Sequence, residues 1–205
     1  MPNWCYSTIA FYQEDEKNDR LELLYQDLEK YIDYQKKESS GWIGSLLKAK
    51  EVDTENLSCR AFICYLDCSD DYFKMDLKSA WVPMPTAYEK IAELYDLKMV
   101  YIAEEHGSTT YVNTDIEGRH FLTRYLLTKL VDISDEIKEK MSTDSRYDDI
   151  LKDLGKNIEY FETFEDVQSY FRDVKFDTLD ELNALLNRVD CNVFRFESDD
   201  SDYKD

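Results

Sequence analysis

The chain has 205 residues and a formal net charge of -20, because 45 Asp and Glu residues are balanced by only 25 Lys and Arg residues. With 43% hydrophobic and 14% aromatic residues but only 5 Gly and 3 Pro, the composition predicts a folded protein. It excludes a chain that is solvated and acidic throughout, a collagen-like chain and a linker-rich chain. The charge opposes binding to nucleic acid, anionic membranes and anionic metabolites, and it favours basic partners.

The sequence contains neither a secretory signal nor an uninterrupted apolar run of about 20 residues, the length that spans a membrane. Its cysteines are odd in number and unevenly spaced, at Cys5, Cys59, Cys64, Cys68 and Cys191. This usage is typical of a reducing cytosol rather than of a disulfide framework. We therefore expect a cytoplasmic protein of a bacterial host, with no membrane partner.

The first half of the sequence alternates strand and helix patterns. Runs of β-branched and aromatic residues predict strands, and apolar residues three and four apart predict helices. In chain order these are strand 7–11, helix 21–32, a helical turn at 42–47, strands 60–66 and 72–81, helix 86–95, and strands 98–103 and 109–113. A capping box at Thr86-Ala87-Tyr88-Glu89 is expected to start the helix at 86–95. The order β-α-β-β-α-β with an extra hairpin strand predicts a ferredoxin-like sheet in an α+β fold.

The second half is expected to be a mostly helical extension. Helices are predicted at 121–132, 134–141, 145–154 and 163–174 and after a capping box at Thr178, and strands at 158–161 and 192–197. No flexible linker separates the halves. We expect a ferredoxin-like domain at 1–121, a helix-rich α+β extension at 122–198 that shares its core, and an acidic tail at 199–205.

The sequence contains two unusual motifs, Met1-Pro2-Asn3-Trp4-Cys5 and Ala80-Trp81-Val82-Pro83-Met84-Pro85. Trp42-Ile43-Gly44 lies between them, and the segment 101–107 follows them, ahead of Tyr111 and Gly118. This order of motifs matches that of a known protein family. Over residues 1–121 the chain resembles the YubB-type, Api92-like ferredoxin-like proteins of phages, plasmids and conjugative elements. It departs from that pattern at Ser7, where those proteins usually carry Asn, and it lacks the Gly that often closes their first strand.

The resemblance implies a mobile-element origin and a ferredoxin-like fold without an iron–sulfur cluster. It implies no established activity, so it supplies no catalytic residues and no cofactor. Structural roles are expected for the motif residues, since Trp rings bury large areas and Pro sets a strand-to-helix corner. These residues are Trp4, Cys5, Trp42, Trp81 and Pro83.

The most catalytic-looking group is Glu104-Glu105-His106 with Asp115 and Glu117. A hairpin turn that joins carboxylates and an imidazole would suit acid–base work or a hard metal ion, so a hydrolase is one alternative. Against it, Glu104 and Glu105 point to alternate faces of an extended strand. In a chain with 45 acids, such clusters also arise by chance.

Cys64 and Cys68 invite a zinc interpretation, but four extended residues separate them by about 13 Å. Both thiolates would reach one ion only if the chain turned directly after Leu66. We therefore predict buried free cysteines and no metal site.

An RNA-binding ferredoxin-like module is a further alternative. Such sheets bind RNA when aromatic residues lie on a basic face, and Tyr65, Phe73, Tyr101 and Tyr111 would supply the stacking. The net charge of -20 opposes contact with phosphates, so direct nucleic-acid binding is disfavoured.

The acidity itself has two interpretations, solubility or a charge decoy that occupies the basic groove of a nucleic-acid enzyme. The hypothesis adopted is a non-enzymatic, mobile-element-encoded protein that inhibits a host defence nuclease of CRISPR or restriction type by stoichiometric binding. Tyr near acidic residues suits an interface because it combines contact area with a polar tip. The candidate partner-binding residues are Glu104, Glu105, Asp115, Glu117, Asp135, Glu136, Tyr147, Asp148, Asp149, Glu165 and Asp166.

Overall fold

A computed structural model describes residues 3–14, 19–32, 41–69, 71–129, 158–172, 174–187 and 191–198. The chain divides into two compact units, one formed by Met1–Phe121 with Glu197–Asp205 and the other by Leu122–Phe196. Both units combine helices with antiparallel strands, so the predicted α+β class is confirmed. Each unit contains its own cluster of buried hydrophobic residues.

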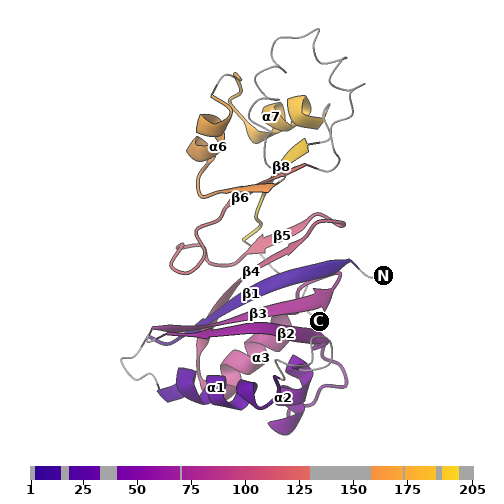
Figure 1. The fold of residues 1–205 in the computed structure, drawn as a ribbon, viewed down its shortest axis with the longest axis vertical. Coiled ribbons are helices and arrows are strands. Elements are labelled where there is room, and N and C mark those ends of the chain that lie inside the picture. Colours follow the sequence, from indigo (N-terminus) through magenta and orange to yellow (C-terminus); the bar gives the residue numbers. More distant parts are fainter. Residues whose placement is uncertain are drawn as a thin grey trace. The chain divides into compact units, whose positions relative to one another are not determined.

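The first unit contains a five-stranded antiparallel sheet with its helices on one face (Figure 1). The strands are β1 (Trp4–Tyr12), β2 (Ala61–Cys68), β3 (Tyr72–Ala80), β4 (Lys98–Glu105) and β5 (Thr110–Asn113), and the helices are α1 (Asp19–Glu29), α2 (Ile43–Ala49) and α3 (Pro85–Tyr95). The strand order is β2-β3-β1-β4-β5. The central strands β1 and β3 pair along their whole length.

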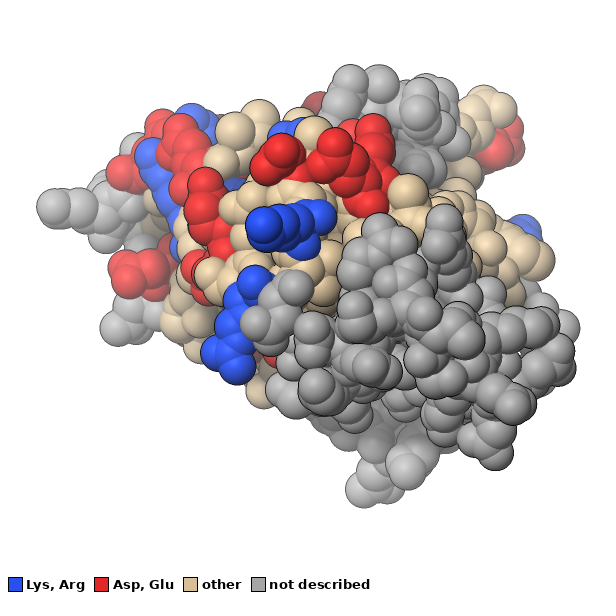
Figure 2. Space-filling view, turned by 90° about the horizontal axis from the view of Figure 1, so that it is seen from above, with Lys and Arg blue, Asp and Glu red and all other residues tan. Residues whose placement is uncertain are grey.

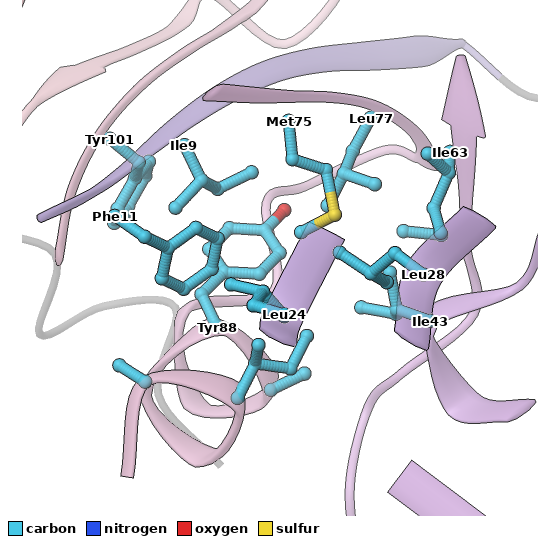
Figure 3. Packing of buried hydrophobic residues seen from close by; sticks show 14 of the residues in the cluster. Ile9, Phe11, Leu24, Leu28, Ile43, Ile63, Met75, Leu77, Tyr88 and Tyr101 are labelled. Atoms are coloured by element: carbon cyan, nitrogen blue, oxygen red, sulfur yellow. The ribbon is translucent and has the colours of Figure 1, made fainter. Parts of the chain in front are cut away.

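Alternation along β3 decides which face of this sheet meets the helices. Phe73, Met75 and Leu77 are buried, whereas the residues between them are only partly buried. Because successive side chains of a strand point to opposite faces, the buried residues form one apolar face. Figure 3 shows Met75 and Leu77 in one cluster with Leu24 of α1 and Tyr88 of α3. The opposite face of the sheet therefore carries the intervening residues.

The second unit contains a three-stranded antiparallel sheet of order β7-β6-β8. Its strands are β6 (Tyr125–Lys129), β7 (Ile158–Phe161) and β8 (Cys191–Arg195), and its helices are α6 (Phe164–Tyr170) and α7 (Leu179–Leu186). Leu127 of β6 and Val193 of β8 pack with Val167 and Phe171 from the α6 region and with Leu182 of α7. A separate small core results.

Three local expectations are wrong. The predicted helix at 121–132 is a strand at Tyr125–Lys129, because β6 pairs with both β7 and β8 and this pairing overrides the helical spacing. The described part of the second unit holds three strands and two helices, so it is not mostly helical. The helix start expected at Thr86 is one residue late, since α3 begins at Pro85 and its N-cap residue is Met84, whose side chain makes no capping hydrogen bond. Proline favours the first helical position because its missing N–H has no partner there.

The starts of α6 and α7 follow the sequence signals more closely. Thr163 and Asp166 form a complete capping box. The Thr178 hydroxyl accepts a 3.2 Å hydrogen bond from the Glu181 backbone N–H, while the Glu181 carboxylate accepts from the Asp177 N–H. Both helices therefore begin at a side-chain cap.

The predicted helices at 134–141 and 145–154 and the acidic tail at 199–205 lie outside the described residues. Among the helices that the structure describes, none is both long enough and apolar enough to cross a bilayer.

Candidate functional site

The sheet face opposite α1, α2 and α3, which we call the open face, carries a row of side chains that crosses all five strands. Backbone pairing joins Tyr111 to Glu104 and Glu104 to Tyr6. It then joins Tyr6 to Lys78 and Lys78 to Phe62. Directly paired residues of an antiparallel sheet point to the same side, so these side chains are neighbours.

One end of the open face, the covered end, is overlaid by segment 114–121. Tyr12 and Tyr72 pair across β1 and β3, and their ring centres lie 4.9 and 5.9 Å from the His120 ring centre. The Lys74 ammonium group lies 4.9 Å from the Tyr72 ring centre and donates a 3.3 Å hydrogen bond to the His120 carbonyl oxygen. The segment thus supplies this end with a ring and a carbonyl acceptor.

Asp115 fixes the covering segment. Its carboxylate accepts hydrogen bonds of 2.6 and 2.8 Å from the backbone N–H groups of His120 and Phe121, and the Asn113 side-chain amide donates to the Phe121 carbonyl oxygen. Burial alone would raise the pKa of Asp115, but the backbone hydrogen bonds to its carboxylate outweigh burial and lower the pKa below its ordinary value. This buried carboxylate therefore holds a turn rather than facing a partner.

The other end of the open face presents the same chemistry without a covering segment of its own unit. The Lys78 ammonium group lies 4.4 Å from the Trp4 ring centre and 5.6 Å from the Tyr6 ring centre. Tyr6 is 48% exposed and Tyr65, on the neighbouring β2, is 56% exposed. Within the described part of the chain, no hydrogen bond or ion pair engages the Lys78 ammonium group, which contacts the two rings. We call Trp4, Tyr6, Tyr65 and Lys78 the aromatic patch.

Trp81 adjoins the aromatic patch in the backbone. It follows β3, whose last residue Ala80 pairs with Trp4, and its N–H donates a 2.9 Å hydrogen bond to the Asn3 carbonyl oxygen. Its φ of 73° lies in the left-handed region that bulky residues avoid, yet its side chain is 52% exposed. Strain of this kind costs about 1–3 kcal/mol and is concentrated at binding and active sites. Trp81 belongs to one of the two unusual motifs of the sequence, but only the structure shows that its ring faces solvent.

Three of the other motif residues, Cys5, Trp42 and Pro83, are buried or partly buried. Cys5 is fully buried, and burial raises its pKa to about 11. Pro83 is buried, and the half-buried Trp42 has its ring centre 3.6 Å from that of Phe62. Trp81 differs from these three residues, because its side chain is 52% exposed.

The predicted catalytic group is divided between the two faces of the sheet. Glu105 is buried, and its carboxylate accepts hydrogen bonds from Gly107 and Ser108 within the turn. Burial would raise the pKa of Glu105, but these hydrogen bonds give a net lowering. Glu104 lies on the open face beside Tyr6. Among the described residues, no group of three or more His, Cys, Asp or Glu side chains is placed to hold a metal ion.

The other members of this group form separate local contacts. The His106 ring Nδ1 and the Tyr111 hydroxyl share a 3.1 Å hydrogen bond, and burial raises the pKa of Tyr111 to about 12. Glu117 forms a 2.6 Å ion pair with Arg119, and both side chains are exposed. These contacts stabilise the turns that flank β5.

The candidate residues of the second unit are only partly described. Glu165 is exposed in the first turn of α6, whereas the Asp166 carboxylate is occupied by the Thr163 cap. The remaining candidates lie outside the described residues: Asp135, Glu136, Tyr147, Asp148 and Asp149.

The aromatic residues proposed for RNA stacking do not share one accessible surface. Phe73 and Tyr101 belong to the helix-facing core, and Tyr111 is buried, which leaves Tyr65 exposed on the open face. The alternation of Trp4 and Tyr6 with the smaller Cys5 and Ser7, which are buried, was the sequence signal for the open face. It was missed because the first strand was predicted to start at residue 7.

The two cysteines considered as a zinc pair form no disulfide. Cys64 and Cys68 are both exposed, so the expectation that they are buried is wrong. Their sulfur atoms donate weak hydrogen bonds to the carbonyl oxygens of Phe62 and Ser69.

Charges of both signs share the molecular surface. Figure 2 shows Asp and Glu side chains gathered in bands on one face, with Lys and Arg side chains lying between them. On the open face, Lys74 and Lys78 alternate with Asp76, whose carboxylate accepts a 2.7 Å hydrogen bond from the Thr8 hydroxyl. The open face is therefore mixed in charge rather than basic. Comparisons of the chain with protein-family models, with curated proteins and with solved structures gave no match.

Proposed function

We propose that this protein is a non-enzymatic interaction protein that binds a basic, nucleic-acid-handling partner through the aromatic patch and Trp81. The main support for this proposal is that one end of the open face is covered by a peptide segment and the other end is exposed. At the covered end, a peptide segment places a ring against Tyr12 and Tyr72 and a carbonyl oxygen on Lys74. The aromatic patch offers equivalent rings and an equivalent ammonium group to an outside polypeptide.

The charges support a partner with exposed Arg side chains. Arg stacks on aromatic faces and pairs with carboxylates, and both groups are present where Tyr6 lies beside Glu104 and Tyr65 beside Asp76. Exposed Trp and Tyr are also the residues that dominate protein interfaces energetically. The net charge of -20 would accelerate encounter with a basic protein.

The class of partner follows from the resemblance to YubB-type, Api92-like proteins. All neighbouring strands of the first sheet are antiparallel, and the order β2-β3-β1-β4 supports a ferredoxin-like assignment for the first unit. A protein carried by a phage or conjugative element benefits if it blocks a host nuclease of CRISPR or restriction type. We infer stoichiometric inhibition in the bacterial cytoplasm, by occupation of the nuclease's nucleic-acid groove or by a block of its conformational change.

RNA binding is the second candidate, because exposed aromatics with lysines on an open sheet face are how RNA modules stack bases. Trp4, Tyr6 and Lys78 fit that description. Asp76 and Glu104 on the same face, together with the net charge, weigh against phosphate contacts.

The test compares Trp81→Ala and Tyr6→Ala with a matched control, Tyr160→Ala. Tyr160 is 46% exposed and belongs to the second unit. Each immobilised protein is exposed to lysate of a bacterial host at low salt, and retained proteins are identified, purified and retested for binding and for nucleic-acid cleavage. We expect a basic nuclease to bind the unchanged protein and the control, and to bind Trp81→Ala and Tyr6→Ala at least about tenfold more weakly.

Equal binding by all variants would refute the assignment of the interface to the aromatic patch. If no basic nucleic-acid-handling protein is retained, the proposed function fails. Direct RNA binding that weakens steeply as salt rises would establish the second candidate instead.

A further inference from the structure

A hollow of about 700 Å³ lies in the first unit between α2 and the loop formed by residues 54–60, and Met84 also lines it. Small-molecule sites occupy roughly 300–1,000 Å³, so its size suits a ligand of nucleotide dimensions. None of the candidate partner-binding residues lines it.

The wall of the hollow is held in place by close packing. A Cβ atom at Gly44 of α2 would lie 2.9 Å from the Cys59 sulfur and 3.3 Å from the Cys59 carbonyl oxygen, so the loop approaches the helix as closely as glycine allows. The loop is also bonded internally, because the Glu55 N–H donates a 3.0 Å hydrogen bond to the Asp53 carboxylate. The hollow is therefore formed before any ligand arrives.

The charge of the hollow runs against that of the chain. Lys48 and Arg60 line it, with Glu55 as the acidic lining residue. Within the described part of the chain, no ion pair or hydrogen bond engages the Lys48 ammonium or the Arg60 guanidinium group. Other cations of this unit do have carboxylate partners, as Lys90 has in Glu93. Two cations in one concave site, with no partner among the described residues, favour an anionic ligand.

The hollow also has an aromatic wall. Trp42 lines it, and the Trp42 ring is supported by Phe62 at 3.6 Å between ring centres. Indole faces stack on planar rings, and the stacking tolerates different bases because every base has a π face. Ser45 and Ser58 add hydroxyl groups to the lining.

We propose that this hollow binds a small anion that carries a planar ring, of the nucleoside monophosphate class. The ring stacks on Trp42, and the phosphate is held by Lys48 and Arg60, with hydroxyl donors beside it. The proposal is independent of the proposed function, since it concerns neither Tyr6 nor Trp81.

The experiment measures binding of AMP, adenosine and inorganic phosphate to the full chain by titration calorimetry at low salt. AMP is expected to bind more tightly than either fragment, because only AMP uses both the ring and the cations. Arg60→Gln and Lys48→Gln should each weaken AMP binding by about tenfold, the usual cost of losing a hydrogen bond to a charged group. Trp42→Leu should weaken binding of AMP and adenosine together.

Two controls make the outcome decisive. Lys90→Gln removes a cation outside the hollow, and Trp81→Ala removes an aromatic ring outside it, so both should leave AMP affinity unchanged while circular dichroism confirms folding. Absence of AMP binding at millimolar concentration, or unchanged affinity in Arg60→Gln and Lys48→Gln, would overturn the proposal. A single-stranded oligonucleotide that binds far more tightly than AMP and competes with it would also overturn it, in favour of nucleic-acid binding.

Discussion

The two ends of the open face carry the same groups under different conditions. At the covered end, Tyr12 and Tyr72 lie under His120, and Lys74 has a carbonyl acceptor. In the aromatic patch, Trp4 and Tyr6 flank Lys78, which has no such acceptor among the described residues. The covered end shows how this fold satisfies an aromatic–lysine cluster when a peptide segment is available, and so indicates what a partner would supply to the patch.

This comparison separates stability from recognition. Groups at the covered end are bonded within the protein, so their loss should reduce the free energy of unfolding. Groups of the aromatic patch have fewer internal contacts, so their loss should affect binding and leave stability nearly unchanged. Substitutions at equivalent positions of the two ends can break the comparison or sharpen it.

The largest effect on stability is expected from Asp115→Ala, which removes the hydrogen-bond acceptor that holds segment 114–121 in place. The backbone N–H groups of His120 and Phe121 then lose their bonds, and each unsatisfied buried donor costs about 1–3 kcal/mol. We expect the free energy of unfolding in urea to fall by about 3 kcal/mol. The control Glu117→Ala breaks only an exposed ion pair and should change stability by less than about 1 kcal/mol. Unchanged stability in Asp115→Ala would show that another contact holds segment 114–121 in place.

The sequence predicts the elements that build the covered end better than the contacts that cover it. Strand patterns identified all five strands of the first sheet, because alternating β-branched and aromatic residues have a local cause. The roles of Asp115 and His120 were not predictable in this way. They depend on segment 114–121 folding back over β1 and β3, which no local pattern specifies. The strand β6 was missed for the same reason, since its partners are distant in sequence.

A smaller effect is expected from exchanging the two lysines for Met, one at a time. Lys74→Met removes a hydrogen bond to the His120 carbonyl oxygen and a cation–π contact with Tyr72, and should lower the free energy of unfolding by about 1 kcal/mol. Lys78→Met removes only cation–π contacts, so it should lower the free energy of unfolding by about 0.5 kcal/mol and also weaken partner binding. Equal destabilisation by both variants would mean that the two ends are equivalent, and the contrast behind the proposed function would be lost.

The acid dependence of the covered end provides a third test. Burial lowers the pKa of His120 below its ordinary value, with Lys74 and Arg119 acting in the same direction and Asp115 opposing them. A lowered folded-state pKa means that the stabilisation is complete above the unfolded pKa, about 6.5, and is lost as the pH falls through the folded value. NMR signals of Tyr12 should therefore shift in this window, while those of Tyr6 stay constant. His120→Phe should abolish the shift, and a shift that persists in this variant would assign it to another group.

The candidate site was harder to predict than the fold because it is defined by exposed side chains, and exposure depends on tertiary packing. Trp81 belongs to an unusual motif, and a structural role was expected for it because Trp is usually buried. Glu105 was marked by its acidic neighbours, yet its carboxylate is occupied by Ser108. In both cases the surroundings of the side chain, its exposure at Trp81 and its hydrogen bonds at Glu105, depend on the backbone conformation and could not be read from the residue type.

The smallest effect, and the only one of opposite sign, is expected at Trp81. Glycine adopts a φ of 73° without steric cost, so Trp81→Gly relieves strain, although glycine also loses more chain entropy on folding. The balance predicts a gain in stability of up to about 1 kcal/mol. Trp81→Ala keeps the strained backbone, so the difference between the two variants isolates the strain.

Both Trp81 variants lack the ring and should lose partner binding equally. If Trp81→Gly destabilises the fold by as much as Tyr12→Ala does, the Trp81 ring supports the protein itself. Trp81 would then belong with the internally bonded groups of the covered end, and the exposure of its ring would no longer argue for a partner.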